Sequence, residues 1–113
     1  MHLFKKIFTN RAVINVSDET FGVTFTHWAW KKGCWSLRWD DVIAIDAMQV
    51  EPAFIGLGFF IAKNRWKFVS EDMENWNLLQ DAVRKGYPDF NWDHFEQAKG
   101  FIESRFPCWK RQE

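Results

Sequence analysis

The sequence is poor in cysteine and proline, and it contains no long uninterrupted apolar run. Its two cysteines, Cys34 and Cys108, lie too far apart for a CxxC redox or zinc motif. We expect both to be reduced thiols packed in the interior of a cytoplasmic protein, because free cysteine is usually buried. A membrane-spanning helix would need about 18 consecutive apolar residues. The first nine residues also lack the apolar centre of a signal peptide.

The chain has no net charge, since 15 basic residues balance 15 acidic ones. This balance argues against a general nucleic-acid-binding protein, because such proteins depend on neutralising phosphates. The charges are nevertheless unevenly distributed. Residues 1–39 hold six basic and two acidic residues, an excess of four positive charges, and the remainder carries the opposite excess. Separated charge of this kind speeds and orients association with a protein partner.

Aromatic residues make up 19% of the 113 residues, with Trp 8 and Phe 12 but Tyr only 1. A chain of this length forms one domain, residues 1–113, with a core that needs no disulfide or metal. Phenylalanine mostly fills such cores, whereas tryptophan is large and carries a polar N–H. Eight tryptophans exceed what one small core encloses. We therefore expect some of them to be partly exposed.

Apolar residues alternate with polar ones between about residues 12 and 69, which is the pattern of half-buried antiparallel strands. Asp40-Asp41 and Asn64-Arg65 interrupt the alternation and are expected to form turns. Gly56 and Gly58 share one face of an apolar strand, and they indicate strong coiling, a bulge, or a group packed close to the backbone. The predicted strands cover residues 12–16, 21–26, 35–39, 42–49, 54–63 and 66–70.

Two helices are predicted after the strands. The first covers residues 71–85, with Ser70 as its cap and an inward stripe of Met73, Trp76, Leu79 and Val83, widened by Leu78 and Ala82. The second covers residues 92–105 and ends before Pro107. Gly100 within it should cost roughly 1 kcal/mol relative to alanine. Residues 108–113 are expected to form a polar tail.

The segment Leu37-Arg38-Trp39-Asp40-Asp41-Val42-Ile43-Ala44-Ile45 resembles small bacterial members of the pleckstrin-homology-like superfamily. These often read as apolar–x–Trp–x–acid–apolar–x–x–apolar where a strand turns a corner. The resemblance covers roughly residues 12–85. It implies an α+β fold, an antiparallel meander or partly open β-barrel of five to seven strands, followed here by two C-terminal helices. For eukaryotic relatives it implies binding of lipid headgroups at a barrel mouth.

No catalytic, cofactor-binding or metal-binding residue is predicted from the sequence, and no cofactor is expected. Asp40 and Asp41 are adjacent, so on a strand they would point to opposite faces and would not converge on one substrate. His94 and Glu96 are two positions apart, so on a helix they do not face each other. The Gly56-x-Gly58 pair lies inside a strand and not before a helix, which excludes a phosphate-binding loop.

A protein partner is expected to contact two segments. Aromatic residues stand beside cations in the first, and acids cluster in the second; the predicted contact residues are Trp28, Trp30, Lys31, Lys32, Glu71, Asp72 and Glu74. In an alternative interpretation one of the two tryptophans belongs to the core and the acids form an ordinary solvated helix face. The cations are fewer than the 4–8 that usually mark a membrane-binding segment, so a membrane is not the favoured partner.

Three hypotheses about function remain open. The first is a non-catalytic protein-binding domain, specifically a bacterial immunity-type inhibitor that neutralises a cognate toxin by covering its active site. The second is a peripheral lipid-headgroup-binding module. The third is a small-ligand carrier, or an enzyme whose site is assembled only in the folded chain, and it requires a sizeable pocket with convergent polar groups.

Overall fold

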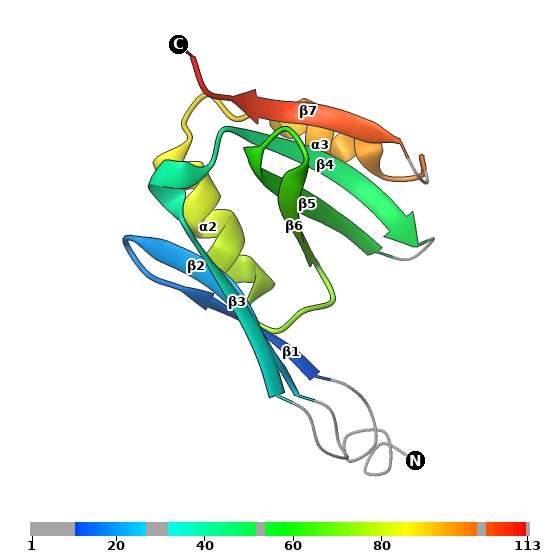
Figure 1. Cartoon of the computed structure of the whole chain (residues 1–113). Coiled ribbons are helices and arrows are strands. Elements are labelled where there is room, and N and C mark those ends of the chain that lie inside the picture. Colours follow the sequence, from blue (N-terminus) through cyan, green and yellow to red (C-terminus); the bar gives the residue numbers. More distant parts are fainter. Residues whose placement is uncertain (1–10, 27–31, 52–53, 102–103, 113) are drawn as a thin grey trace.

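A computed structural model of the chain describes residues 11–26, 32–51, 54–101 and 104–112, and the remaining residues lie outside the description (Figure 1). The described residues form an α+β fold with seven antiparallel strands in two sheets and two α-helices. The α+β class predicted from the sequence is therefore confirmed. The two sheets are not closed into a barrel, which corrects that part of the prediction.

The first sheet has the strand order β1-β2-β3. Its strands are β1 (Arg11–Val16), β2 (Thr20–Thr26) and β3 (Lys32–Arg38). Ile14, Val23 and Trp35 lie opposite one another across the three strands. The row is apolar because successive side chains of a strand alternate between faces, and this face meets the core.

A short 3₁₀ helix, η1 (Trp39–Asp41), carries the chain from the first sheet to the second. The Trp39 N–H donates to the Glu19 carbonyl at 3.0 Å, and the Val42 N–H closes the turn onto the Trp39 carbonyl at 3.2 Å. The turn predicted at Asp40-Asp41 is thus confirmed.

The second sheet has the order β6-β5-β4-β7. Its strands are β4 (Ala44–Glu51), β5 (Phe54–Ala62), β6 (Arg65–Ser70) and β7 (Arg105–Lys110). Because Ala62 pairs with Arg65, the turn between β5 and β6 consists of residues 63–64, one position before the predicted turn.

The close packing expected at the two glycines of β5 is confirmed. A Cβ atom on Gly56 would collide with the Phe68 ring and the Val69 carbonyl. A Cβ atom on Gly58 would lie 2.6 Å from the Met48 methyl carbon and 3.3 Å from the Trp66 ring. The glycines therefore let side chains of β4 and β6 pack directly against the backbone of β5.

The helix α2 (Trp76–Gly86) begins five residues later than residue 71, where the sequence predicted it. Ser70 ends β6 and caps nothing, because its hydroxyl donates to the Asp72 carboxylate. The Glu71 N–H donates to the Ile55 carbonyl at 2.9 Å, which prolongs the contact with β5. The residue that precedes the helix is Asn75, in the left-handed region at φ 71°.

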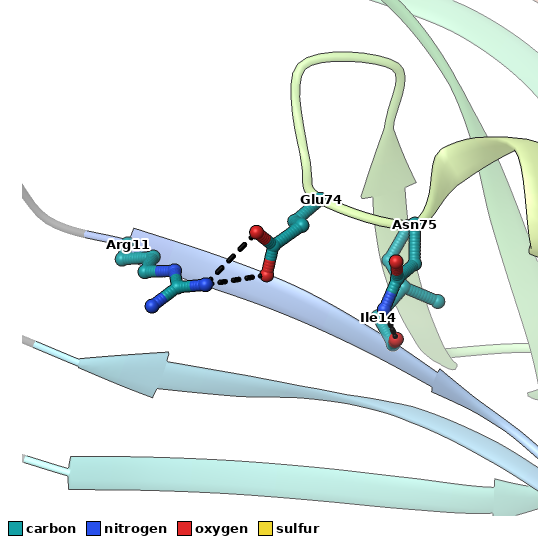
Figure 2. A network of polar contacts seen from close by, with 4 residues as sticks. All are labelled: Arg11, Ile14, Glu74 and Asn75. Atoms are coloured by element: carbon teal, nitrogen blue, oxygen red, sulfur yellow. Dashed lines mark hydrogen bonds and ion pairs between the residues drawn. The ribbon is translucent and has the colours of Figure 1, made fainter.

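The segment before α2 is fixed to the edge of β1, as Figure 2 shows. The Ile14 N–H donates to the Glu74 carbonyl at 2.9 Å, and the Glu74 N–H donates to the Ala12 carbonyl at 3.0 Å. The Arg11 guanidinium donates to both oxygens of the Glu74 carboxylate at 2.8 Å, and the Asn75 side-chain amide donates to the Ile14 carbonyl at 3.0 Å (Figure 2). These pairings replace the early helical turn that the acidic residues had suggested.

The helix α3 (Trp92–Ala98) is shorter than predicted, ending at Ala98 instead of residue 105. Gly100 adopts a positive φ of 93°, and its N–H donates to the Gln49 side chain at 2.6 Å. The chain then reverses and forms β7 along β4, where a polar tail had been predicted. Cys108 in this strand is only 4% exposed. The fold therefore ends on a strand that the sequence pattern did not reveal.

One core joins the two sheets and both helices. Phe21 of β2 packs on Phe59 of β5 with their ring centroids 4.6 Å apart, and Leu79 and Val83 of α2 are fully buried. Leu78 is 54% exposed, so the apolar stripe of α2 is narrower than predicted.

The described helices are also too short or too polar to cross a lipid bilayer.

Candidate binding cleft

The predicted aromatic contact segment lies mostly outside the described residues. This applies to Trp28, Trp30 and Lys31. Lys32 is the first residue of β3, and its backbone lies opposite Thr26 of β2. The role of these residues in binding a partner stays a prediction.

The predicted acidic contact residues are described, and all three lie between β6 and α2, not in the helix. Each accepts a hydrogen bond from within the chain. Glu74 accepts from Arg11, Asp72 accepts from the Ser70 hydroxyl, and Glu71 accepts from the Ile55 N–H at 3.3 Å. All three remain exposed, so a contact with a partner also stays a prediction for them.

The described His, Cys, Asp and Glu side chains do not form a metal centre. Among the residues that the structure describes, no three His, Cys, Asp or Glu side chains lie where they could share a metal ion. His94 lies near the start of α3, and its Nδ1 is 2.5 Å from the Pro107 carbonyl of β7. This contact joins the helix to the last strand.

A cleft of about 610 Å³ lies on one side of the molecule. Four segments form its walls: the turn between β1 and β2, the η1 corner, the C-terminal part of α2, and the end of β7 with Arg111 beyond it. In Figure 1 these four segments lie on the same side of the molecule, with η1 between the β1–β2 turn and the end of β7. The cleft therefore lies at the seam between the two sheets.

Three aromatic residues, Trp39, Tyr87 and Trp109, line the cleft. The Tyr87 ring meets Trp109 edge to face with centroids 4.5 Å apart, and the centroid of Trp39 lies 6.0 Å from that of Tyr87. Trp39 also stacks on the core residue Phe21 at 4.0 Å. The aromatic wall is thus the outer edge of the hydrophobic core and is held by it.

The polar atoms of these three rings are all bonded within the chain. The Trp39 Nε1–H donates to the Ser17 carbonyl at 3.0 Å, and the Trp109 Nε1–H donates to the Asp89 carboxylate at 3.1 Å. The Tyr87 hydroxyl donates to the Trp39 carbonyl at 3.3 Å. Tyr87 is only 8% exposed, and burial raises its pKa to about 12, with the Asp40 charge adding to the rise and Arg111 opposing it. A ligand in the cleft would therefore meet the exposed ring surface of the half-buried Trp39 and Trp109 and not these donors.

Charged side chains surround the aromatic wall. They are Asp18, Asp40, Asp81, Lys85 and Arg111, three acids against two bases. The Arg111 guanidinium donates to the main-chain oxygen of Asp40. Within the described part of the chain, none of these five side chains forms an ion pair. Their charges are consequently available to a ligand.

The sequence patterns did not indicate this cleft, because its residues come from four segments that are distant along the chain. Trp39-Asp40 had been recognised as a corner between strands, and that role is correct. Trp109 had been assigned to a polar tail, whereas β7 carries it back to the end of α2. The excess of tryptophan was the one signal of a partly exposed aromatic surface. Trp39 and Trp109 confirm that expectation, since both are half-buried.

Comparison with known proteins identifies no family. No protein-family model matches the chain, and no solved structure matches it. A segment of 47 residues is 38% identical to the keratinocyte differentiation-associated protein of Rattus norvegicus. That segment makes up 40% of this chain and 48% of the rat protein, so the chain spans about half the length of this relative. The similarity is too partial to place the chain in a family.

Proposed function

We propose that the chain is a non-catalytic protein-binding domain and that the cleft is its contact site. The observation that carries the proposal is the composition of the cleft. Trp39, Tyr87, Trp109 and Arg111 stand together in one concavity. Tryptophan, tyrosine and arginine are the residue types that contribute most to binding energy at protein interfaces, and they do so in pockets that exclude water.

The cleft is also preorganised. Both tryptophans and the tyrosine are held by hydrogen bonds to groups of the same chain, and Trp39 rests on Phe21. A partner would not have to order these side chains, and each rotamer-rich side chain immobilised on binding costs about 0.5–1.5 kcal/mol. This rigidity favours the interpretation of the cleft as a contact surface. The alternative interpretation, an incompletely covered edge of the core, does not require ordered side chains.

The narrower proposal is a bacterial immunity-type inhibitor that occludes the active site of a cognate toxin. It is motivated by the size of the chain, the surplus of tryptophan and the separated charge, together with a cleft that would accept a protruding segment of the toxin. A lipid-headgroup role rests on the superfamily resemblance alone.

The proposal is tested by capturing partners in the cells that produce the protein, using chemical crosslinking and mass spectrometry. The baits are the wild-type chain, Asp81→Lys in the cleft, and Asp93→Lys as a matched control. Both aspartates are exposed on helices, but only Asp81 lines the cleft. A true partner is captured by the wild type and the control and is lost with Asp81→Lys.

The captured protein is then purified, and its affinity for the three variants is measured by calorimetry. Asp81→Lys should weaken binding by roughly tenfold or more, as expected for a reversed charge within an interface. Equal affinity for all three variants would refute the cleft as the contact site. For the narrower proposal, the partner's own toxic activity must fall to zero at one equivalent of the chain.

A small-ligand carrier is a second candidate, because the volume of the cleft falls in the range of about 300–1,000 Å³ typical of small-molecule sites. Native mass spectrometry of the chain purified from its own cells tests it. A bound mass that disappears in Asp81→Lys and persists in Asp93→Lys would favour the carrier over the protein-binding domain.

A further inference from the structure

We infer that the group which the cleft accepts is a cationic side chain of the partner, specifically an arginine. This inference rests on the proposed function, since it names the chemistry of the partner segment that enters the same cleft. It is carried by two independent features of the cleft, its ring faces and its carboxylates.

The first feature is the orientation of the aromatic groups. The N–H groups of Trp39 and Trp109 and the hydroxyl of Tyr87 are used inside the chain. None of these three donors is left to bind an anion. Trp39 and Trp109 line the cleft and are only half-buried, so part of their ring surface is exposed in it. The face of an aromatic ring is electrostatically negative. Such faces attract cations, and they suit the planar guanidinium of arginine best because it can also stack on them.

The second feature is the set of carboxylates around the rings. Asp18 on the β1–β2 turn and Asp81 on α2 belong to different walls of the cleft. In the described part of the chain neither carboxylate has an ion-pair partner. A guanidinium has five N–H donors in a fork that matches carboxylate oxygens. An arginine seated on the rings would therefore find acceptors at its end.

The two cations of the cleft do not reverse this preference. Arg111 is fixed to the main-chain oxygen of Asp40 at the η1 wall. Lys85 follows Asp81 by one helical turn, so it competes with an incoming arginine for that carboxylate. An acidic side chain of the partner would be repelled by the three carboxylates of the cleft. A purely apolar side chain would remove these carboxylates from water without offering them a hydrogen-bond donor.

The inference is tested with three capped peptides that differ at one position, Ac-Gly-Arg-Gly-NH₂, Ac-Gly-citrulline-Gly-NH₂ and Ac-Gly-Glu-Gly-NH₂. Citrulline has the shape of arginine without its charge. Each peptide is titrated into the ¹⁵N-labelled chain, and the indole N–H signals of Trp39 and Trp109 are followed by NMR. The arginine peptide should shift both signals and bind roughly tenfold more tightly than the citrulline peptide. The glutamate peptide should shift neither.

Three variants locate the binding site. Asp81→Asn should weaken arginine binding by roughly threefold to tenfold, and Lys85→Ala should strengthen it, because a competitor for the carboxylate is removed. Asp93→Asn removes an exposed carboxylate of a helix outside the cleft and should leave the affinity unchanged.

The inference is overturned if the citrulline or glutamate peptide binds as tightly as the arginine peptide, or if no peptide shifts the two indole signals. It is also overturned if Asp93→Asn lowers the affinity for the arginine peptide as much as Asp81→Asn does. These results leave the proposed function intact, because it fails on a different measurement. It fails when the purified protein partner binds Asp81→Lys as well as it binds the wild type.

Discussion

Cys34 and Cys108 show how two residues of the same type acquire different chemistry from their positions. Cys34 is exposed on β3, one of the two edge strands of the first sheet, which corrects the expectation that both thiols are packed. Cys108 is buried on β7, and burial raises its pKa to about 12, more than the hydrogen bond from Ala47 lowers it. The thiolate is the reactive form of cysteine, so Cys108 is protected both by burial and by protonation.

We predict that a thiol-reactive aromatic disulfide labels one cysteine of the native protein at pH 8 and labels the second only in urea. The release of the coloured thiol, measured by absorbance, gives the number of reacted groups. Cys34→Ser should abolish labelling of the native protein, and Cys108→Ser should leave it unchanged. Rapid labelling of both thiols without denaturant would contradict the placement of Cys108.

At the scale of elements, the strands followed the sequence pattern closely and the helix boundaries did not. Alternation is a local property of a strand, and the predicted strands from Phe21 to Ser70 lie within a few residues of the observed ones. The acids after Ser70 look like a first helical turn, but their backbone groups pair with β1 and β5. A helix start depends on which partners the backbone finds, and those partners are distant in sequence.

Gly100 gives a test in which the two interpretations predict opposite signs. If it lay within a helix, Gly100→Ala would stabilise the protein by roughly 1 kcal/mol. The structure places it at φ 93° beyond the end of α3, where alanine is strained. We therefore expect Gly100→Ala to lower the free energy of unfolding in urea by about 1 kcal/mol.

The matched control is Gly86→Ala, at the last residue of α2. A Cβ atom there meets nothing within 4 Å, and the residue has no positive φ. The free energy of unfolding of the Gly86→Ala variant should equal that of the wild type or exceed it. A stabilising Gly100→Ala would mean that the helix continues through this position.

At the scale of the whole molecule, one core connects two sheets that share no strand. Phe21 is one link, because it touches Trp39 at the corner and Phe59 in the second sheet. The same stack supports the aromatic wall of the cleft. Folding of the core and shape of the candidate site are therefore coupled through this residue.

We expect Phe21→Ala to lower the free energy of unfolding by about 3–5 kcal/mol, the usual cost of deleting a buried phenylalanine. Both sheets should still unfold together, so far-ultraviolet circular dichroism and tryptophan fluorescence should give coincident urea transitions. Two separate transitions, in the variant or in the wild type, would show that the sheets are independent units and would contradict the single core.

The amino-acid sequence by itself determined the α+β class, most of the strands and the corner at Trp39, and it narrowed the role of Gly56 and Gly58 to coiling, a bulge or close packing. All of these follow from alternation, turn residues or the size of a side chain, which act over a few neighbouring positions. The tertiary structure alone decided the strand β7, the delayed start of α2, the exposure of Cys34 and the cleft. Each of these depends on contacts with segments that are distant in the sequence, and local sequence patterns do not specify such contacts.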